Sequence, residues 1–246
     1  MNNMNQPIIS ANKLTKKYKD FLALQFLDLT VHKGEIFGFL GHNGAGKTTT
    51  VSLLTTLLQP TSGTASVCGF DIVKESIEVR KRIGYLPENV KFYDNLTAFE
   101  NLDYLAKLSG IHDPKKKIAE VLEFLEFTDI ENKKLGEFSK GMRQRIGIAQ
   151  AILHSPEVLF LDEPTAGLDP MGIKKLRETI IKLSHEMGMT IFMNTHLLSE
   201  VAKTCTTIGV LNHGKLVYKD SLTNTLKKFH DETSLEEIYF SMEENQ

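Results

Sequence analysis

Three short segments are apolar along their whole length and are bounded by residues that break regular structure. They are residues 34–41 (GEIFGFLG), 157–164 (EVLFLDEP) and 190–196 (TIFMNTH). A continuous apolar run of this length, without alternation, is typical of a strand that is buried on both faces. The pattern therefore predicts three core strands.

Between these segments, apolar residues recur at the i, i+3, i+4, i+7 spacing of an amphipathic helix. This spacing predicts helices over residues 118–125, 142–153 and 173–183. A helix is also expected over 48–58, and Thr97 with Glu100 forms a capping box before another. Buried strands that alternate with helices predict an α/β fold with a mostly parallel sheet.

The two ends of the chain have a different pattern from the middle. Residues 8–31, 206–214 and 215–220 alternate in a way that suits antiparallel strands. Residues 86–153 are rich in helical patterns and contain no evident buried strand, which predicts a helical insertion between the first predicted core strand (34–41) and the next one (157–164).

We therefore expect one α/β domain over residues 7–230, with a helical subdomain of about 88–155 inserted. The expected C-terminal tail, 231–246, has a helical stripe of Leu235, Ile238, Tyr239 and Met242.

Composition narrows the function classes without choosing one. The chain has 246 residues, a net charge of -2, 41% hydrophobic and 24% charged residues, as ordinary globular proteins do. It has no apolar run long enough to cross a membrane, and the first residues, MNNMNQP, lack the apolar stretch of a signal peptide. The near-zero charge gives no case for nucleic-acid binding, and the distant Cys68 and Cys205 make no disulfide framework. A cytosolic protein is expected.

A complete phosphate-binding motif follows the first predicted core strand. Residues 41–48 (GHNGAGKT) match G-x-x-x-x-G-K-[ST], with a strand before and a helix after. Glycines allow the loop's N–H groups to face phosphate oxygens, and the helix N-terminus adds partial positive charge. Lys47 would neutralise the β- and γ-phosphates, and the Thr48 hydroxyl would coordinate Mg²⁺.

Two acids end the second predicted core strand. Asp162 suits the Mg²⁺ shell, whereas Glu163, one residue on, points differently and suits a base that polarises an attacking water. Together with a complete phosphate loop, the pair indicates hydrolysis of a nucleoside triphosphate.

At this point the sequence resembles the ATP-binding cassette (ABC) ATPases over nearly its whole length. Residues 138–153 (FSKGMRQRIGIAQAIL) resemble the family's signature helix, 166–170 (AGLDP) the loop after its catalytic glutamate, and 194–196 (NTH) its switch histidine. Residues 84–89 (GYLPEN) lie where the family has its glutamine loop, and Tyr18 lies where an aromatic ring stacks on adenine.

This resemblance implies a dimer that sandwiches two ATP molecules. Ser139 and Gly141 of one subunit would complete the nucleotide site of the other, and Asp169 would link the two sites. The resemblance implies a catalytic set of Glu163, His196 and Lys47 and a metal set of Thr48, Glu88 and Asp162. It implies a nucleotide-binding set of Tyr18, Gly41, His42, Asn43, Gly44, Ala45, Gly46, Lys47, Thr48, Thr49, Ser139 and Gly141.

Three positions depart from the family pattern. Lys140 and Met142 replace a glycine and a glutamine of the signature, and Glu88 replaces the glutamine of its loop. We expect Lys140 to add positive charge near the opposite nucleotide's phosphates and Glu88 to remain an oxygen ligand for Mg²⁺.

The motifs most resemble exporter-type cassettes that act with separate membrane permeases. Within them the sequence most resembles the copper-processing ATPase of nitrous-oxide reductase maturation, and the multidrug-type, sodium and polysaccharide exporter ATPases are close rivals. The implied protein is a homodimeric ATPase that is cytoplasmic and peripheral on the inner membrane face.

Two other classes stay open on the sequence. A soluble ABC ATPase of DNA repair or translation would need a long coiled-coil insertion or a second cassette, and neither is present. A P-loop GTPase or kinase would need a guanine-reading NKxD motif or a substrate lid, and ENKKLGE lacks the aspartate.

Overall fold

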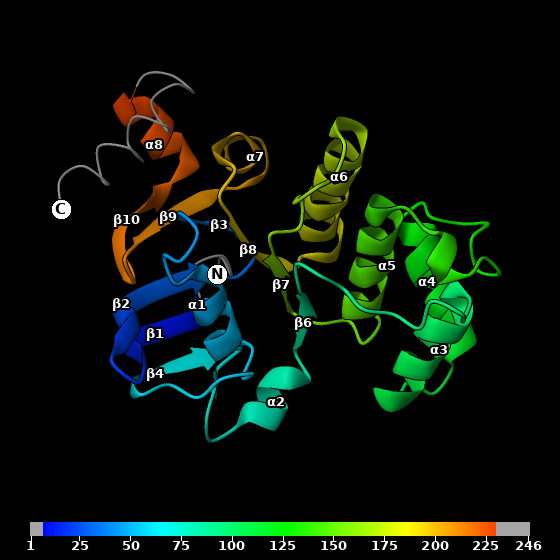
Figure 1. Cartoon of the computed structure of the whole chain (residues 1–246), viewed down its shortest axis with the longest axis horizontal. Helices are drawn as coiled ribbons and strands as arrows, with labels where there is room; N and C mark the ends of the chain where they lie inside the picture. Colours follow the sequence, from blue (N-terminus) through cyan, green and yellow to red (C-terminus); the bar gives the residue numbers. More distant parts are fainter. Residues whose placement is uncertain (1–6, 230–246) are drawn as a thin grey trace, which may run out of the picture.

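In the computed structural model, residues 7–229 are described, and they form two sheets with helices around them (Figure 1). The larger sheet has six strands in the order β10-β9-β3-β8-β7-β6. Its three central strands are the predicted ones: β3 (Ile36–Leu40), β8 (Thr190–Thr195) and β7 (Val158–Asp162). They are parallel and buried at every position, as their apolar sequences require.

The remaining strands extend this sheet on both sides. Strand β6 (Ile83–Leu86) pairs parallel with β7 and forms one edge. At the other edge, β9 (Thr207–Asn212) pairs parallel with β3 and antiparallel with β10 (Lys215–Ser221). The antiparallel pairing predicted near the C-terminal end is thus confirmed for β9 and β10, but both strands belong to the main sheet.

The smaller sheet is antiparallel and has the order β2-β1-β4-β5. It consists of β1 (Pro7–Tyr18), β2 (Phe21–His32), β4 (Ser62–Val67) and β5 (Phe70–Asp71). Its buried residues share one apolar cluster with helix α1 (Lys47–Leu54) and with the phenylalanines of the main sheet. Phe192 lies at that junction, with ring centroids 5.2 Å from Phe37 and 5.4 Å from Phe160. One face of the main sheet is therefore closed by α1 and the small sheet.

The opposite face packs against the other helices. Because neighbouring strand residues point to opposite faces, Ile36 and Leu40 share a second apolar cluster with α6 (Pro170–Met187) and α7 (Leu198–Thr204). The same cluster includes the helices α3 (Ala98–Leu108), α4 (Pro114–Phe124) and α5 (Lys140–Ile152), which lie at one end of the molecule (Figure 1). The short α2 (Ser76–Arg80), the 3₁₀ turn η2 (Leu135–Glu137) and α8 (Leu222–Phe229) complete the elements.

Two expectations from the sequence need correction. The helix expected over 48–58 ends at Leu54, because Thr56 has a left-handed φ of 64° and Pro60 follows. The helical insertion was expected directly between the phosphate-binding strand β3 and the next strand of the core. In the structure a further strand of the main sheet, β6, comes before the insertion, so α3, α4 and α5 lie between β6 and β7. The capping box of Thr97 and Glu100 is confirmed at the start of α3. The predicted tail 231–246 lies outside the described residues.

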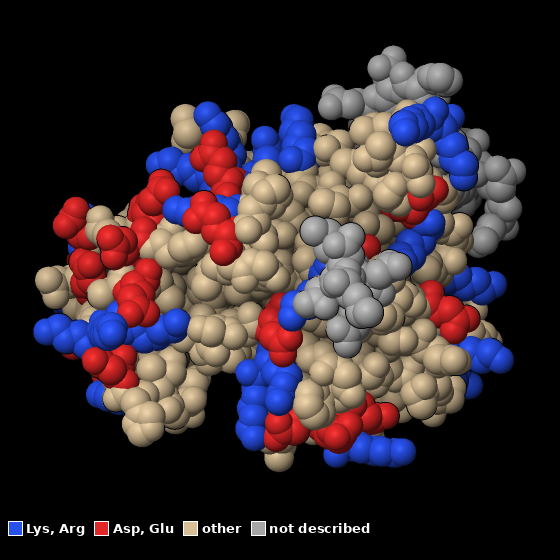
Figure 2. Space-filling model, turned by 180° about the vertical axis from the view of Figure 1, so that it is seen from behind, with Lys and Arg blue, Asp and Glu red and all other residues tan. Residues whose placement is uncertain are grey.

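Acidic and basic side chains are interleaved on the face seen in Figure 2, without an extended field of one sign. Within residues 7–229, no helix has both the length and the hydropathy that a membrane crossing requires.

Candidate functional site

The phosphate-binding motif forms the connection from β3 to α1, in the structural context that the sequence predicts. Gly46 has a φ of 108°, and a Cβ there would lie 2.4 Å from the carbonyl oxygen of Ala23. A Cβ at Gly41 would lie 2.5 Å from the carbonyl oxygen of Leu211. Glycine is needed at both positions because the loop runs against backbone that cannot give way.

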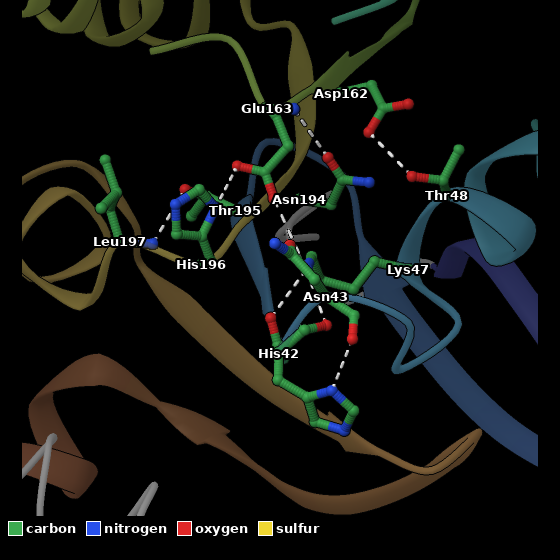
Figure 3. Close-up of polar contacts among 11 residues, drawn as sticks. His42, Asn43, Lys47, Thr48, Asp162, Glu163, Asn194, Thr195, His196 and Leu197 are labelled. Atoms are coloured by element: carbon green, nitrogen blue, oxygen red, sulfur yellow. Dashed lines mark hydrogen bonds and ion pairs between the residues drawn. The ribbon is translucent and has the colours of Figure 1, made fainter. Parts of the chain in front are cut away.

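Lys47 places its ammonium group at the centre of this loop (Figure 3). The Nζ atom donates to the carbonyl oxygens of Gly41 at 2.7 Å and His42 at 3.2 Å. It also lies 3.4 Å from Oε1 of Glu163, and both side chains are buried. The loop therefore presents a desolvated positive charge, which suits an anionic ligand.

Asp162 and Thr48 lie together at the carboxyl ends of β7 and the loop (Figure 3). The Thr48 hydroxyl donates to Oδ1 of Asp162 at 3.3 Å, and the hydroxyl of Tyr85 donates to Oδ2 at 3.5 Å. Burial raises the pKa of the Asp162 carboxyl, and the Asn194 and Thr48 side chains offset this shift only in part. Burial, together with the Asp162 charge, also raises the pKa of Tyr85 to about 12.

A hard oxygen pair of this kind fits Mg²⁺, which prefers oxygen ligands and retains several waters. Residues 7–229 contain no cluster of three His, Cys, Asp or Glu side chains that could hold a metal by themselves. Thr48 and Asp162 supply two oxygen atoms, which leaves positions in an octahedral Mg²⁺ shell for waters and phosphate oxygens.

Glu163 follows Asp162 but faces another way, between Lys47 and His196 (Figure 3). Its Oε2 lies 2.9 Å from Nδ1 of His196, which follows the end of β8. Its backbone N–H donates to the side-chain oxygen of Asn194 at 2.9 Å, and its φ of 46° is left-handed. A non-glycine residue held in that region stores strain that the surrounding contacts must overcome. Lys47, Glu163 and His196 thus form one connected polar chain.

Aromatic side chains line the mouth of the same site. A pocket of about 290 Å³ contains loop residues together with Tyr18, Phe21, Glu88 and Glu163. Tyr18 ends β1 and is partly exposed, with the Lys16 ammonium 5.2 Å from its ring centre. Phe21, at the start of β2, was not among the residues named from the sequence. It could have been noticed because it is an aromatic residue that directly follows the turn at Lys19 and Asp20.

The structure brings together most of the residues predicted to bind nucleotide. The loop members that line the pocket are His42, Asn43, Gly44, Gly46, Lys47, Thr48 and Thr49. Gly41 and Ala45 belong to the same loop, in which the Ala45 N–H donates to the His42 carbonyl at 3.1 Å. Asn194, also unassigned from the sequence although it begins the NTH motif, supports Glu163 from β8.

Ser139 and Gly141 lie elsewhere. They line a separate hollow of about 190 Å³ with Asp169, at the starts of α5 and α6. Ser139 caps α5 by accepting from the Met142 N–H at 3.3 Å, and Asp169 caps α6 by accepting from the Gly172 N–H at 3.1 Å. None of these residues lines the pocket of the phosphate loop in the same chain.

Comparison with known proteins is consistent with this geometry. The family model described as ABC transporter matches residues 24–166. The bacitracin transport ATP-binding protein BcrA of Bacillus licheniformis is 47% identical over 210 residues, which cover 85% of this chain and 68% of that protein. The chain belongs to the ABC transporter family.

Other relatives of this ABC protein agree in sequence and in fold. The BcrA protein of Enterococcus faecalis is 41% identical over 90% of this chain and 71% of its own. The dimeric post-hydrolysis structure of the ATP-binding cassette MJ0796, bound to ADP and Pi, has a TM-score of 0.78 at 25% identity, covering 87% of this chain and 98% of that one. The structure of cbiO1 from Clostridium perfringens has a TM-score of 0.83 over 96% of both chains and supports the fold, at 24% identity.

Membership of this family confirms the predicted fold class, a P-loop α/β core with an antiparallel subdomain and helices. The protein is an ATP-binding subunit of an ABC transporter and an ATPase, which sets aside the GTPase and kinase alternatives. ABC ATPases of this kind act as dimers with membrane permeases. The two BcrA relatives are described as bacitracin transport ATP-binding proteins, and the copper-related likeness stays a prediction.

Proposed function

We propose that this ABC ATPase energises the export of a bacitracin-like peptide antibiotic through a separate membrane permease. The relatives described as bacitracin transport proteins supply the substrate class. The protein would act at the inner face of the cell membrane through its permease, without entering the lipid itself.

The observation that carries the ATPase mechanism is the polar chain from Lys47 through Glu163 to His196, with distances of 3.4 and 2.9 Å. We propose that Lys47 neutralises the β- and γ-phosphates while Glu163 takes a proton from the attacking water. His196 would hold the Glu163 carboxylate and contact the γ-phosphate from the other side. Mg²⁺, when held by Thr48, Asp162 and Glu88, would neutralise charge on the phosphate oxygens.

We propose a homodimer because the two groups of predicted nucleotide ligands are in different places in one chain. Tyr18 would stack on adenine at one site, whereas Ser139 and Gly141 face a separate hollow at a helix N-terminus. A second copy arranged head to tail would bring its Ser139 to the phosphates of the first. Two ATP molecules would then bind at the interface.

A test of this mechanism uses Glu163→Gln, which keeps the shape of the side chain and removes its basicity. Sedimentation with saturating MgATP should give a dimer for Glu163→Gln, and a monomer when Ser139→Glu is added. Hydrolysis should fall by about 10²-fold or more, the contribution expected of a general base. A Glu163→Gln protein that hydrolyses ATP at the original rate, or stays monomeric with MgATP, would contradict the proposal.

The substrate is tested in a bacitracin-sensitive host that expresses the protein with its permease. Expression should raise the bacitracin concentration that stops growth, and Lys47→Ala should abolish the increase. Copper tolerance, measured in the same strains, separates the copper-related alternative. Increased copper tolerance without increased bacitracin tolerance would refute the peptide-antibiotic proposal while leaving the ATPase mechanism intact.

A further inference from the structure

The orientation of His196 depends on the short helix that follows it. Helix α7 begins at Leu198, only two residues after His196, and its N-terminus has no side-chain cap. The backbone between them is fixed by the Leu197 N–H, which donates to the Thr195 hydroxyl at 3.1 Å (Figure 3). Any rotation or shift of α7 would therefore be passed to the His196 ring. The contacts that hold α7 in place, here called its supports, should therefore affect catalysis.

The first support is strand β3. A Cβ at Gly38 would lie 2.7 Å from Sγ of Cys205 and 2.9 Å from Cγ1 of Val201. The absence of a side chain at Gly38 therefore allows α7 to lie directly on the strand that leads into the phosphate loop. This contact sets how close α7 is to the sheet, but a contact of small apolar groups does not by itself fix its rotation.

The second support is an ion pair with α6. Arg177 donates from Nη2 to Oε1 of Glu200 at 3.0 Å and from Nε to Oε2 at 3.3 Å. The Glu200 side chain is only 9% exposed and the Arg177 side chain 23%, so the pair is largely removed from water. Two parallel bonds between a planar guanidinium and a carboxylate define an orientation as well as a distance. Glu200 lies in the first turn of α7, next to the segment that carries His196.

We propose that Arg177 and Glu200 are positioning residues for the Glu163–His196 pair. Their forked contact fixes the rotation of α7 and thereby keeps Nδ1 of His196 at 2.9 Å from the Glu163 carboxylate. The positions of catalytic groups must be fixed accurately, since a misplacement of about 1 Å can reduce the rate of the reaction by about 10²-fold. This inference rests on the roles in hydrolysis proposed above for Glu163 and His196.

The position of the pair separates it from the phosphate-binding loop. Neither Arg177 nor Glu200 lines the pocket that contains Lys47 and Tyr18. Loss of the pair should therefore reduce the rate of hydrolysis while leaving the binding of MgATP almost unchanged. A residue that only stabilised the fold would lower the melting temperature without this selective loss of kcat.

The test begins with Arg177→Met, which keeps the aliphatic stem and removes the guanidinium. We expect kcat for ATP hydrolysis to fall by about tenfold and KM to change by less than about twofold. Arg177→Lys should keep part of the rate, because it retains a charge but loses the fork. The matched control is Lys174→Met on the same helix, whose 4.0 Å pair with Glu178 is exposed and does not reach α7. It should leave kcat, KM and the melting temperature unchanged.

A double variant with His196→Ala decides whether Arg177 acts through His196. If it does, adding Arg177→Met to His196→Ala costs nothing further in single-turnover hydrolysis with labelled ATP. The same loss in both backgrounds, or an unchanged kcat for Arg177→Met, would overturn the inference. Should Arg177→Met fail to fold, Arg177→Lys and Glu200→Gln provide the same comparison. Full activity of His196→Ala itself would instead refute the mechanism proposed for His196.

Discussion

The close contact of β3 with α7 predicts a measurable effect of a single methyl group. In Gly38→Ala the new Cβ would lie 2.7 Å from Sγ of Cys205 and 2.9 Å from Val201, where ordinary contact begins at 3.4 Å. Helix α7 would have to move outward by about 0.7 Å, or both side chains would have to leave their positions. Overpacking of this kind costs about 1–3 kcal/mol.

Thermal unfolding of the nucleotide-free protein measures this cost. For a chain of this size each kcal/mol corresponds to about 2–4 °C, so Gly38→Ala should lower the melting temperature by about 2–12 °C. The ATPase rate should fall as well, because the displaced α7 carries the segment next to His196. KM for MgATP should change little.

Two partner substitutions test the cause. Cys205→Ala and Val201→Ala each remove one of the two contacts, so each should cost less stability in the Gly38→Ala background than alone. A coupling of about 1 kcal/mol in either pair supports the packing argument. An unchanged melting temperature and rate for Gly38→Ala, or additive effects in both pairs, would refute it.

Further predictions concern the nucleotide site and the signature helix. Because burial raises the pKa of Asp162, its carboxylate costs stability; the cost grows as the pH rises from the ordinary Asp pKa and is complete above the raised pKa. Asp162→Asn should therefore raise the melting temperature of the nucleotide-free protein at pH 7, by less as the pH falls towards the ordinary Asp pKa, and should abolish stabilisation by MgATP. The Lys140 ammonium lies against Gly167, where a Cβ would be 2.7 Å from its Nζ. Because its charge is expected near the phosphates of the partner's nucleotide, Lys140→Gly should weaken ATP-dependent dimerisation in sedimentation without changing MgATP affinity in the monomer. Tyr18→Ala should weaken binding of a fluorescent ATP analogue by about tenfold, corresponding to about 1–1.5 kcal/mol of ring contact, and leave triphosphate binding intact.

The sequence predicts those elements whose signal is local and strong. The three central strands are continuous apolar runs, and the helices of 142–153 and 173–183 have an apolar face over several turns, so their burial follows from pattern alone. Strand β6 was missed because it has only four residues and includes the half-buried Tyr85, which follows a glycine. Strand β4 (SGTASV) was missed because half of its residues are exposed and small.

Contacts between distant elements have no comparable signal. Arg177 and Glu200 are separated by 23 residues on two helices, and nothing in the spacing of either helix indicates that they meet. Gly38 lies inside an apolar run in which a glycine is ordinary, and its importance depends on α7, a seven-residue helix too short to predict from periodicity. The candidate catalytic residues could be named from the sequence because each lies in a short, contiguous motif. The residues that we propose to position them are distant from one another in the sequence and form no motif.

The arrangement of α6 relates these separate features to one another. Asp169 caps its N-terminus beside the hollow that contains Ser139, and Arg177, two turns further along, holds α7 through Glu200. A partner subunit that contacted the start of α6 would therefore press on the helix that orients His196 in the same chain. Because α6 is one continuous helix of 18 residues, a small displacement at Asp169 can be passed along it to Arg177. In a head-to-tail dimer this geometry would make the alignment of Glu163 and His196 depend on the partner, so that hydrolysis and dimer formation would be coupled through α6.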